Sequence, residues 1–431
     1  MEIYRKLQER EAAGKPIQAG LVGCGQMGSG MVHAVHNVEG MAMMVIADLV
    51  PDRALAVLAE IGVREQDVVV TDVRGKAEDA LRAGKRVVCT NARLVPELEG
   101  VDAVVEATGF ADNGAQVAWS AIVNRTPVIM LNVETDVTVG ALLDRQARQM
   151  GTVYTVAMGD EPGVLMLLYN QARVMGFEVV CLGKGKNNPV DFTMTPERCA
   201  EEAAGKDMNP KMLCAFIDGT KTMVEMAAVS NATGLLPDKP GMHGRKVELG
   251  ELSRRLIPKA DGGIFERRGT VEYSTGKVAP GVFAIVSSDD EHVRKDMKFF
   301  GHGEGPYYLQ YRPYHNCNLE VPMSIAEAVL YGERTITPLR MYSEVVCVAK
   351  RDLKAGEKVG GIGGGDFFGR IYTYEEALAM QAVPIGLAEA GRVTADIAAG
   401  APMTEQNFAA DSGTFVYRLR KMQDTLIGQE G

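Results

Sequence analysis

The chain has 431 residues, of which 46% are hydrophobic and 24% charged, and its formal net charge is −10. This length exceeds a single hydrophobic core and indicates two or three domains, and the composition is typical of a soluble globular enzyme. The acidic charge argues against a nucleic-acid surface, which would carry a basic stripe, and no apolar run approaches the roughly 20 residues that span a bilayer.

The cysteines and the N-terminal stretch indicate a cytoplasmic protein. The seven cysteines are scattered, without a CxxC pair. This pattern is typical of reduced thiols rather than of a disulfide framework or a thiolate zinc site. The stretch MEIYRKLQEREAAGKP is charged and helix-prone, and it lacks the apolar core of a secretory signal.

The first strong motif is a glycine-rich turn between a strand and a helix. An apolar run at 17–23 predicts a buried strand, and GCGQMG leads from it into a predicted helix at 29–37. Gly23 permits the tight turn, Gly25 lets the backbone approach a pyrophosphate, and Gly28 lets the helix pack closely on the strand. The helix N-terminus then directs free N–H groups at the anion.

The second predicted strand, 43–47, ends in an acid that suits the same cofactor. Asp48 lies about 20 residues after Gly28, where dinucleotide-binding proteins bind the adenosine ribose. The sequence DLVPDR is also typical of a turn that caps a helix. Asp48 would repel the 2′-phosphate of NADP, whereas Arg53 could bind it, so these residues leave NAD and NADP open.

Further buried strands at 102–109 and 127–132 complete a doubly wound nucleotide-binding domain. Ligands of such domains bind outside the carboxyl ends of the strands. The predicted cofactor-binding residues are Gly23, Gly25, Gln26, Met27, Gly28, Asp48, Arg53, Thr108, Gly109 and Asn132.

From Gly151 the pattern changes to a strand, a polar turn, a helix and another strand. The turn contains Asp160 and Glu161, adjacent carboxylates that suit a divalent cation, Mg²⁺ or Mn²⁺. A helix N-terminus would favour the same two acids. After the strand at 179–182, GKGKNN predicts a loop for an anion, because glycines expose N–H groups and lysines supply charge. A solvated basic loop has the same composition.

The stretch AFIDGTKTMVEMA predicts a helix that carries catalytic residues. Asp218, just before the helix, is either an N-cap or a partner of Lys221 near a reacting carbonyl. Lys221 could protonate or polarise the oxygen as hydride arrives at the adjacent carbon. Lys221 and Glu225 also have the spacing of an ordinary surface ion pair.

The remaining segments predict a loop, an aromatic surface and a small β-rich domain. Residues 237–281 are rich in proline, glycine and charge and predict a long loop or lid. The following aromatic stretch contains Arg312 and His315, which suit either a small phosphate-bearing ligand or a domain boundary. Strand and turn patterns predict a β-rich domain at about 343–420, in which GGIGGG is a flexible loop.

The motifs VGCGQMGSGMV, ADLVPDRA, VDAVVEATG and FIDGTKTMVEMA together resemble the homoserine-dehydrogenase-like reductases. AKRDLKAGEKV and VPIGLAEAGRVTADIAAGAPMTEQNF resemble a SAF domain. The combination, over nearly the whole chain, resembles the DXR-like proteins, alternative 1-deoxy-D-xylulose 5-phosphate reductoisomerases. The resemblance implies an NADPH-dependent, metal-dependent enzyme that makes 2-C-methyl-D-erythritol 4-phosphate for isoprenoid precursors.

The resemblance also implies roles for the candidate residues. Asp218 and Lys221 lie where homoserine dehydrogenases place a catalytic Asp and Lys, with a spacing one residue shorter. In a reductoisomerase the metal would bind two substrate oxygens and stabilise an enediolate, and a cationic pocket would hold the phosphate. The implied catalytic residues are Lys221, Asp218 and Glu225, the metal ligands Asp160 and Glu161, and the phosphate ligands Lys184, Lys186, Asn187, Arg312 and His315.

We therefore predict an α/β chain of three domains. They are a Rossmann domain with a doubly wound parallel sheet at 1–156, an α+β catalytic or substrate domain at 157–342, and a small β-rich, SAF-like domain at 343–431. The alternative function is NAD(P)-dependent oxidation or reduction of another small aldehyde, alcohol or sugar phosphate, without rearrangement. A rival of another class is a carbohydrate-binding or assembly protein. We expect a phosphorylated sugar substrate, no nucleic-acid or membrane partner, and a homodimer.

Overall fold

The computed structural model describes residues 2–427, which form two compact units. The first unit takes the chain up to residue 160, then 316–337 and the part from 413 onward; the second takes 161–315 and 338–412. No helix within residues 2–427 is long and apolar enough to cross a membrane. The predicted boundaries after residues 156 and 342 stay predictions, because a compact unit can be assembled from separate stretches of the chain.

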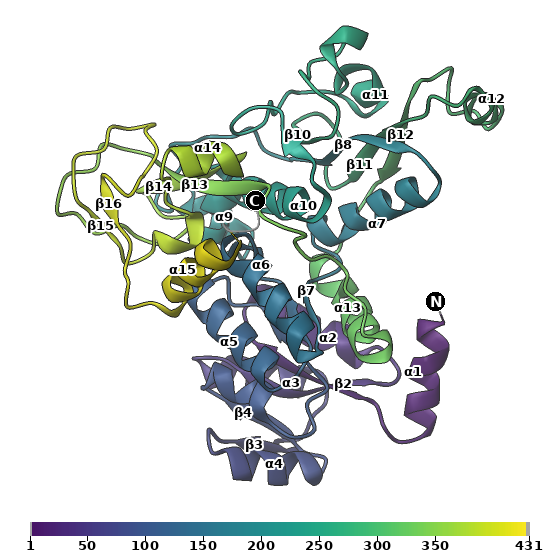
Figure 1. Cartoon of the computed structure of the whole chain (residues 1–431). Coiled ribbons are helices and arrows are strands. Elements are labelled where there is room, and N and C mark those ends of the chain that lie inside the picture. The colour runs from purple at the N-terminus through teal and green to yellow at the C-terminus, as the bar shows by residue number, and fades with distance from the viewer. Residues whose placement is uncertain (1, 428–431) are drawn as a thin grey trace. The chain divides into compact units, whose positions relative to one another are not determined.

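The first unit is built on a seven-stranded parallel sheet in the order β3-β4-β2-β1-β5-β6-β7. Its strands β2, β3, β4 and β7 are labelled in Figure 1. The strand order reverses between β1 and β5, so a crevice for a ligand is expected outside the carboxyl ends of these two strands. The predicted doubly wound fold is confirmed. The strands are β1 (Ile17–Val22), β2 (Met41–Ala47), β3 (Val68–Val70), β4 (Arg86–Cys89), β5 (Ala103–Glu106), β6 (Val128–Met130) and β7 (Tyr154–Val156).

Helices from three separate stretches of the chain complete this unit. Residues of α13 such as Val321 and Ile325 share an apolar core with β1 and α2, and α15 packs against α5 and α6. Helix α13 therefore lies with the seven-stranded sheet, although more than 150 residues separate it from β7. The helices are α1 (Ile3–Ala12), α2 (Gln26–His36), α3 (Pro51–Glu60), α4 (Arg74–Arg82), α5 (Ala111–Val123), α6 (Val133–Met150), α13 (Cys317–Tyr331) and α15 (Phe415–Ile427).

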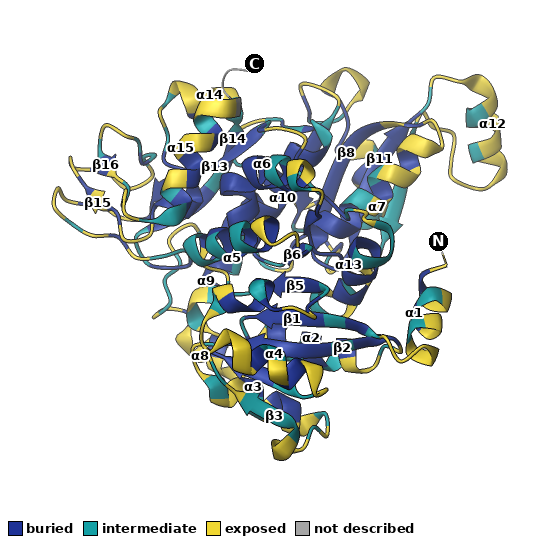
Figure 2. Cartoon of the chain, turned by 60° about the horizontal axis from the view of Figure 1, so that its bottom comes forward, coloured by how far each residue is buried: buried dark blue, intermediate teal, exposed yellow. Residues whose placement is uncertain are grey.

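The second unit contains a five-stranded mixed sheet in the order β12-β11-β8-β10-β9. Helices α7 (Glu161–Val174) and α10 (Thr220–Thr233) pack against it. Figure 2 shows β8 and β11 buried, whereas helix α12 is exposed or half-buried. The other elements are β8 (Glu178–Gly185), β9 (Leu236–Pro237), β10 (Thr270–Ser274), β11 (Val282–Ser287), β12 (Tyr307–Arg312), α8 (Ala200–Gly205), α9 (Pro210–Ile217), α11 (Leu252–Arg255) and α12 (Glu291–Phe299).

The segment 237–281 has long irregular stretches, as predicted, but it also contains regular elements and buried side chains. Its strand β10 lies inside the sheet between β8 and β9. Its buried side chains Leu252, Leu256 and Phe265 join an apolar cluster with Phe283 of β11. These apolar residues are widely spaced among charges and glycines, so no short periodic pattern indicates that they are buried.

The remainder of the second unit is β-rich, as predicted. Strands β13 (Ser343–Ala349) and β14 (Phe367–Thr373) pair antiparallel and pack on α10. The GGIGGG loop is not free, because an added Cβ at Gly363 would lie 2.1 Å from the Lys211 carbonyl oxygen. The remaining elements are α14 (Tyr374–Ala379), β15 (Arg392–Val393) and β16 (Phe408–Ala409).

A buried carboxyl in helix α6 predicts that the fold is less stable at neutral pH than at mildly acidic pH. Asp136 is buried and accepts a hydrogen bond of 3.0 Å from the Tyr154 hydroxyl. Burial, followed by the neighbouring Asp144 carboxylate, raises the pKa of Asp136 to about 7. Because the folded-state pKa exceeds the unfolded value of about 4, stability is lost as the pH rises from about 4 to 7. Glu106 and Glu272, whose pKa burial also raises to about 7, act in the same direction.

Asp136→Asn is therefore expected to reduce the loss of unfolding free energy between about pH 4 and 7. Relative to wild type, the variant should gain on the order of 2–4 kcal/mol in free energy of unfolding between pH 4.5 and 8. Urea unfolding at several pH values measures the difference. The exposed Asp79→Asn, whose carboxylate pairs with Arg82, is the control and should give a profile parallel to wild type. A parallel profile for Asp136→Asn would show that this carboxyl is already ionised in the folded protein.

Candidate functional site

The glycine turn of the first unit has the geometry of a dinucleotide-binding loop. Gly23 has a φ of +95°, and an added Cβ at Gly28 would lie 2.0 Å from the Gly23 carbonyl oxygen. An added Cβ at Gly25 would meet no heavy atom of the described chain within 4 Å. Gly28 thus allows the helix to pack closely on the strand, whereas Gly25 leaves an open approach. Helix α2 begins earlier than predicted and includes Gln26 and Met27 in its first turn.

Asp48 ties the end of β2 to the glycine turn. One carboxylate oxygen accepts a 2.8 Å hydrogen bond from the Cys24 N–H, and the other accepts one of the same length from the Val50 N–H. The exposed Arg53 guanidinium lies 3.8 Å from this carboxylate. Two backbone N–H groups already engage the carboxylate, so its role at a ribose stays a prediction, and the choice between NAD and NADP stays open.

The carboxyl ends of β5 and β6 form a partly buried polar cluster, in which Glu106 and Asn132 are buried. The Thr108 N–H and hydroxyl both donate to the Glu106 carboxylate, and the Asn113 amide donates to the Thr108 hydroxyl oxygen over 3.2 Å. Asn132 caps α6 and donates to the Phe110 carbonyl oxygen over 3.1 Å. Glu106 is not among the residues predicted from sequence, although an acid within the apolar strand VDAVVEATG is a detectable signal. Gly109, with a φ of +72°, follows this cluster.

In the second unit, Lys184 is held between two buried carboxylates. Its Nζ contacts Glu161 at the start of α7 and Glu225 in α10, and all three side chains are at most 8% exposed. The His315 Nε2 lies 3.4 Å from the same Glu161 carboxylate. Lys184 does not lie in the predicted loop, because β8 continues to Gly185 and this lysine is a buried strand residue. The phosphate-binding role of Lys184 and Lys186 stays a prediction.

The two lysines of GKGKNN have different electrostatic surroundings. Burial opposes the charge of Lys184, but the Glu161 and Glu225 carboxylates outweigh it and raise the pKa of this lysine above its ordinary range. Lys186 donates a 2.6 Å hydrogen bond to the Phe216 carbonyl oxygen. Burial, followed by the Lys184 charge, lowers the pKa of Lys186 to about 8, against the opposing effects of Glu225 and Asp218. Lys186 is thus able to exchange a proton near neutral pH.

Asp218 pairs with a lysine that the sequence analysis missed. Its carboxylate lies 2.7 Å from the Lys350 Nζ, and both side chains are buried. Asp218 is the C-cap of α9, and Gly219 holds the N-cap position of α10. The Asp218 carboxylate nevertheless accepts a 2.8 Å hydrogen bond from the Thr220 N–H in the first turn of α10, as a capping side chain does. Lys221 lies in the first turn of α10 and is half-buried. Lys350 stands in a stretch that reads locally as a strand end and turn, so only the tertiary structure reveals its pairing.

The other predicted residues lie in both units. Arg312 ends β12, and its guanidinium lies 4.4 Å from the centre of the Tyr314 ring. Asn187 is exposed just beyond β8. Asp160 belongs to the first unit, where its buried carboxylate accepts a hydrogen bond from the Cys317 thiol over 3.4 Å. Their predicted roles in phosphate and metal binding stay predictions.

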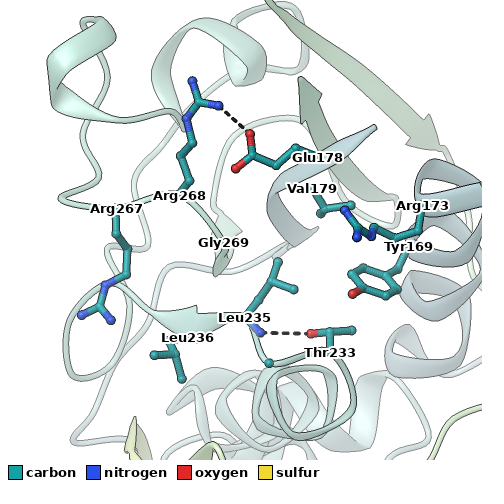
Figure 3. A pocket seen from close by; sticks show the side chains of 11 residues that line it. Tyr169, Arg173, Glu178, Val179, Thr233, Leu235, Leu236, Arg267, Arg268 and Gly269 are labelled. Carbon is teal, nitrogen blue, oxygen red and sulfur yellow. Dashed lines mark hydrogen bonds and ion pairs between the residues drawn. The ribbon is translucent and has the colours of Figure 1, made fainter. Parts of the chain in front are cut away.

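A cavity of about 260 Å³ in the second unit is separate from these residues (Figure 3). It is lined by Tyr169, Glu178 and the basic side chains Arg173 and Arg268, among others. Glu178 begins β8, whereas Lys184 lies near the other end of that strand. None of the predicted site residues lines the cavity.

Residues 159–321 match the family model described as "Oxidoreductase DRL, catalytic domain". This segment includes the Lys184 cluster, Lys186, Asp218 and Lys221. No curated protein matches the sequence.

The chain also has distant similarity to solved structures. A probable dehydrogenase from Thermotoga maritima is 10% identical, with a TM-score of 0.42 over 74% of this chain and 90% of that one. An Agrobacterium radiobacter oxidoreductase, solved with NAD⁺, L-tartaric acid and magnesium, is 14% identical, with a TM-score of 0.40 over 63% and 72%. The 1-deoxy-D-xylulose 5-phosphate reductoisomerase from Zymomonas mobilis, solved with NADPH, is 14% identical, with a TM-score of 0.38 over 73% and 82%.

These similarities are too low to transfer the substrate of any of the three proteins. The catalytic-domain match and the seven-stranded nucleotide-binding sheet identify the chain as an NAD(P)-dependent oxidoreductase.

Proposed function

We propose that the protein transfers a hydride between NAD(P)H and the carbonyl carbon of a small polar substrate, without carbon rearrangement. The observation that carries this proposal is the buried pair of lysines inside the oxidoreductase-like segment. Burial lowers the pKa of Lys186 to about 8, and the Lys184 ammonium is held in one position by Glu161 and Glu225. The nicotinamide, when bound, supplies or accepts the hydride, and the chain's own groups must supply or accept the proton.

We propose Lys186 as the group that moves this proton. In the reducing direction its ammonium would give a proton to the substrate oxygen while hydride arrives at the carbon, which leaves a neutral amine and an alcohol. A buried lysine suits this role better than an exposed one, because burial brings its pKa towards the working pH. Lys221, the group predicted from sequence, remains a second proposed donor from the same segment.

The role of Lys186 predicts a specific pH profile. The rate of carbonyl reduction should fall as the pH rises through about 8, because the protonated amine is lost. Lys186→Arg keeps the positive charge but cannot release its proton, so kcat should fall by about 10²–10⁴-fold and the alkaline limb should disappear. Initial rates between pH 6 and 10 measure both effects. Lys206→Arg changes an exposed lysine that pairs with Glu202 and should behave as wild type.

Our second proposal is that the protein is an NADPH-dependent reductoisomerase acting on 1-deoxy-D-xylulose 5-phosphate. Its support is the resemblance of the sequence motifs to the DXR-like proteins. This reaction needs a divalent cation to stabilise the enediolate, whereas plain hydride transfer does not. The two proposals therefore differ in their metal dependence and in the carbon skeleton of the product.

One experiment tests both proposals. NADPH and NADH oxidation would be followed against a panel of phosphorylated ketoses and aldoses, with Mg²⁺, with Mn²⁺ and with EDTA, and products would be identified by NMR. Turnover that survives EDTA and gives an unrearranged alcohol supports the first proposal. Turnover abolished by EDTA, with a branched product, supports the second. Absence of turnover with every substrate and cofactor contradicts both and favours the non-enzymatic rival.

The remaining proposals concern the cofactor, assembly and location. We propose NADP as the preferred cofactor, with the exposed Arg53 as the group that meets its 2′-phosphate, and a homodimer as the assembly. A cytoplasmic location is proposed because the seven cysteines lack the paired spacing of a disulfide framework.

A further inference from the structure

Two buried glutamates of the second unit share one lysine as their counter-ion. Glu161 and Glu225 come from different helices, α7 and α10, and their carboxylates converge on the Nζ of Lys184. The three side chains are between 3% and 8% exposed, so solvent screens them little. The cluster is a carboxylate–ammonium–carboxylate bridge built from three elements of one unit.

This arrangement does not fit a divalent cation at the pair. Mg²⁺ and Mn²⁺ require carboxylate oxygens that are free to coordinate, and Mg²⁺ also keeps several waters. One oxygen of each carboxylate instead faces the ammonium, and the His315 Nε2 lies 3.4 Å from the same oxygen of Glu161. A cation there would either displace Lys184 or lie against its like charge. The prediction that Glu161 ligates a metal therefore disagrees with the partners that surround this side chain.

We infer that Lys184 occupies the position that a divalent cation would take between Glu161 and Glu225. The chain thus supplies its own fixed positive charge at this point of the catalytic segment. The ammonium cannot exchange with solvent ions, and its position is set by strand β8 rather than by metal supply. The position of the Lys184 charge is inferred independently of the proposed function. Only its use rests on that function, in which the ammonium would stabilise negative charge on a substrate oxygen.

The test is Mn²⁺ binding to the full chain, measured by isothermal titration calorimetry and by the loss of the free-ion EPR signal. The Mn²⁺ titrations of wild type and of Glu225→Gln should be equal, because no saturable Mn²⁺ site in wild type depends on Glu225. Lys184→Met leaves two buried carboxylates without their counter-ion, so it should bind one Mn²⁺ at least tenfold more tightly than wild type. Added Mn²⁺ should also raise the Tm of this variant but not that of wild type. Lys186→Met removes the other lysine of the strand end and should create no site.

Two results would overturn the inference. One is a wild-type Mn²⁺ site that disappears in Glu225→Gln, and the other is a folded Lys184→Met that gains no Mn²⁺ affinity. If Lys184→Met does not fold, the comparison of wild type with Glu225→Gln decides alone: equal titrations support the inference, and a site lost in the variant contradicts it. None of these measurements depends on turnover. Failure of the proposed function would therefore leave the Mn²⁺ result unaffected, and failure of the Mn²⁺ test would leave the proposed hydride transfer unaffected.

Discussion

Gly25→Ala is expected to weaken NADPH and NADH binding by about 100-fold, or about 2.7 kcal/mol, while leaving the free energy of unfolding nearly unchanged. The added methyl group would meet no described heavy atom of the chain within 4 Å, so the folded protein has space for it. It would project into the approach that the diphosphate needs, because this glycine precedes the first turn of α2 and exposes its N–H groups. Fluorescence titration with NADPH and urea unfolding measure the two quantities.

Two other glycines serve as matched controls. At Gly28 a methyl group would lie 2.0 Å from the Gly23 carbonyl oxygen, so Gly28→Ala should lose about 1–3 kcal/mol of stability through overpacking. At Gly75, an exposed position in the first turn of α4, the methyl group would meet no described atom within 4 Å, and Gly75→Ala should gain about 0.5–1 kcal/mol. Unchanged nucleotide affinity in Gly25→Ala would show that the diphosphate does not lie at this turn.

Lys350→Met is expected to destabilise the protein by about 3–5 kcal/mol, because it leaves the fully buried Asp218 carboxylate without its counter-ion. The lost ammonium also donates 2.7 Å and 2.6 Å hydrogen bonds to the Met194 and Gly364 carbonyl oxygens, which hold the glycine-rich loop near α9. Differential scanning calorimetry and urea unfolding of the full chain measure the loss.

The nearby Lys354 offers a matched control for this experiment. It also pairs with an aspartate, Asp396 at 2.8 Å, but the two side chains are 68% and 60% exposed. An exposed pair contributes at most about 1 kcal/mol, so Lys354→Met should change stability little. Small and equal losses of stability in Lys350→Met and Lys354→Met would show that the Lys350 ammonium does not stabilise the fold.

The same pair also tests the catalytic role predicted for Asp218. A structural role predicts that Asp218→Asn lowers the Tm. A lower kcat at an unchanged Tm would instead place this carboxylate in the chemistry. Because the Asp218 charge also raises the pKa of Lys186, a loss of kcat confined to alkaline pH would instead report on that lysine.

The sequence by itself determined the nucleotide-binding half of the protein. GCGQMG, the acid at the end of β2 and the apolar strands are short-range patterns, and each expresses a constraint between residues that are close in the chain. The strand, turn and helix around Gly23, the parallel sheet and the β-rich character of the last segment were therefore predictable. Boundaries moved by a few residues, as α2 did, because helix ends depend on capping contacts.

Only the tertiary structure decided which groups meet in the second unit. Lys184 contacts Glu161 and Glu225, 23 and 41 residues away, and Asp218 meets Lys350, which lies beyond β13. A local reading pairs Glu225 with Lys221 and leaves Lys184 for an anion, because spacing along a helix reports only neighbours on that helix. The return of α13 to the nucleotide-binding unit is likewise invisible in sequence. Burial and charge pairing arise from contacts between distant segments, and these contacts determine the pKa of Lys186 and the counter-ion of the acidic pair.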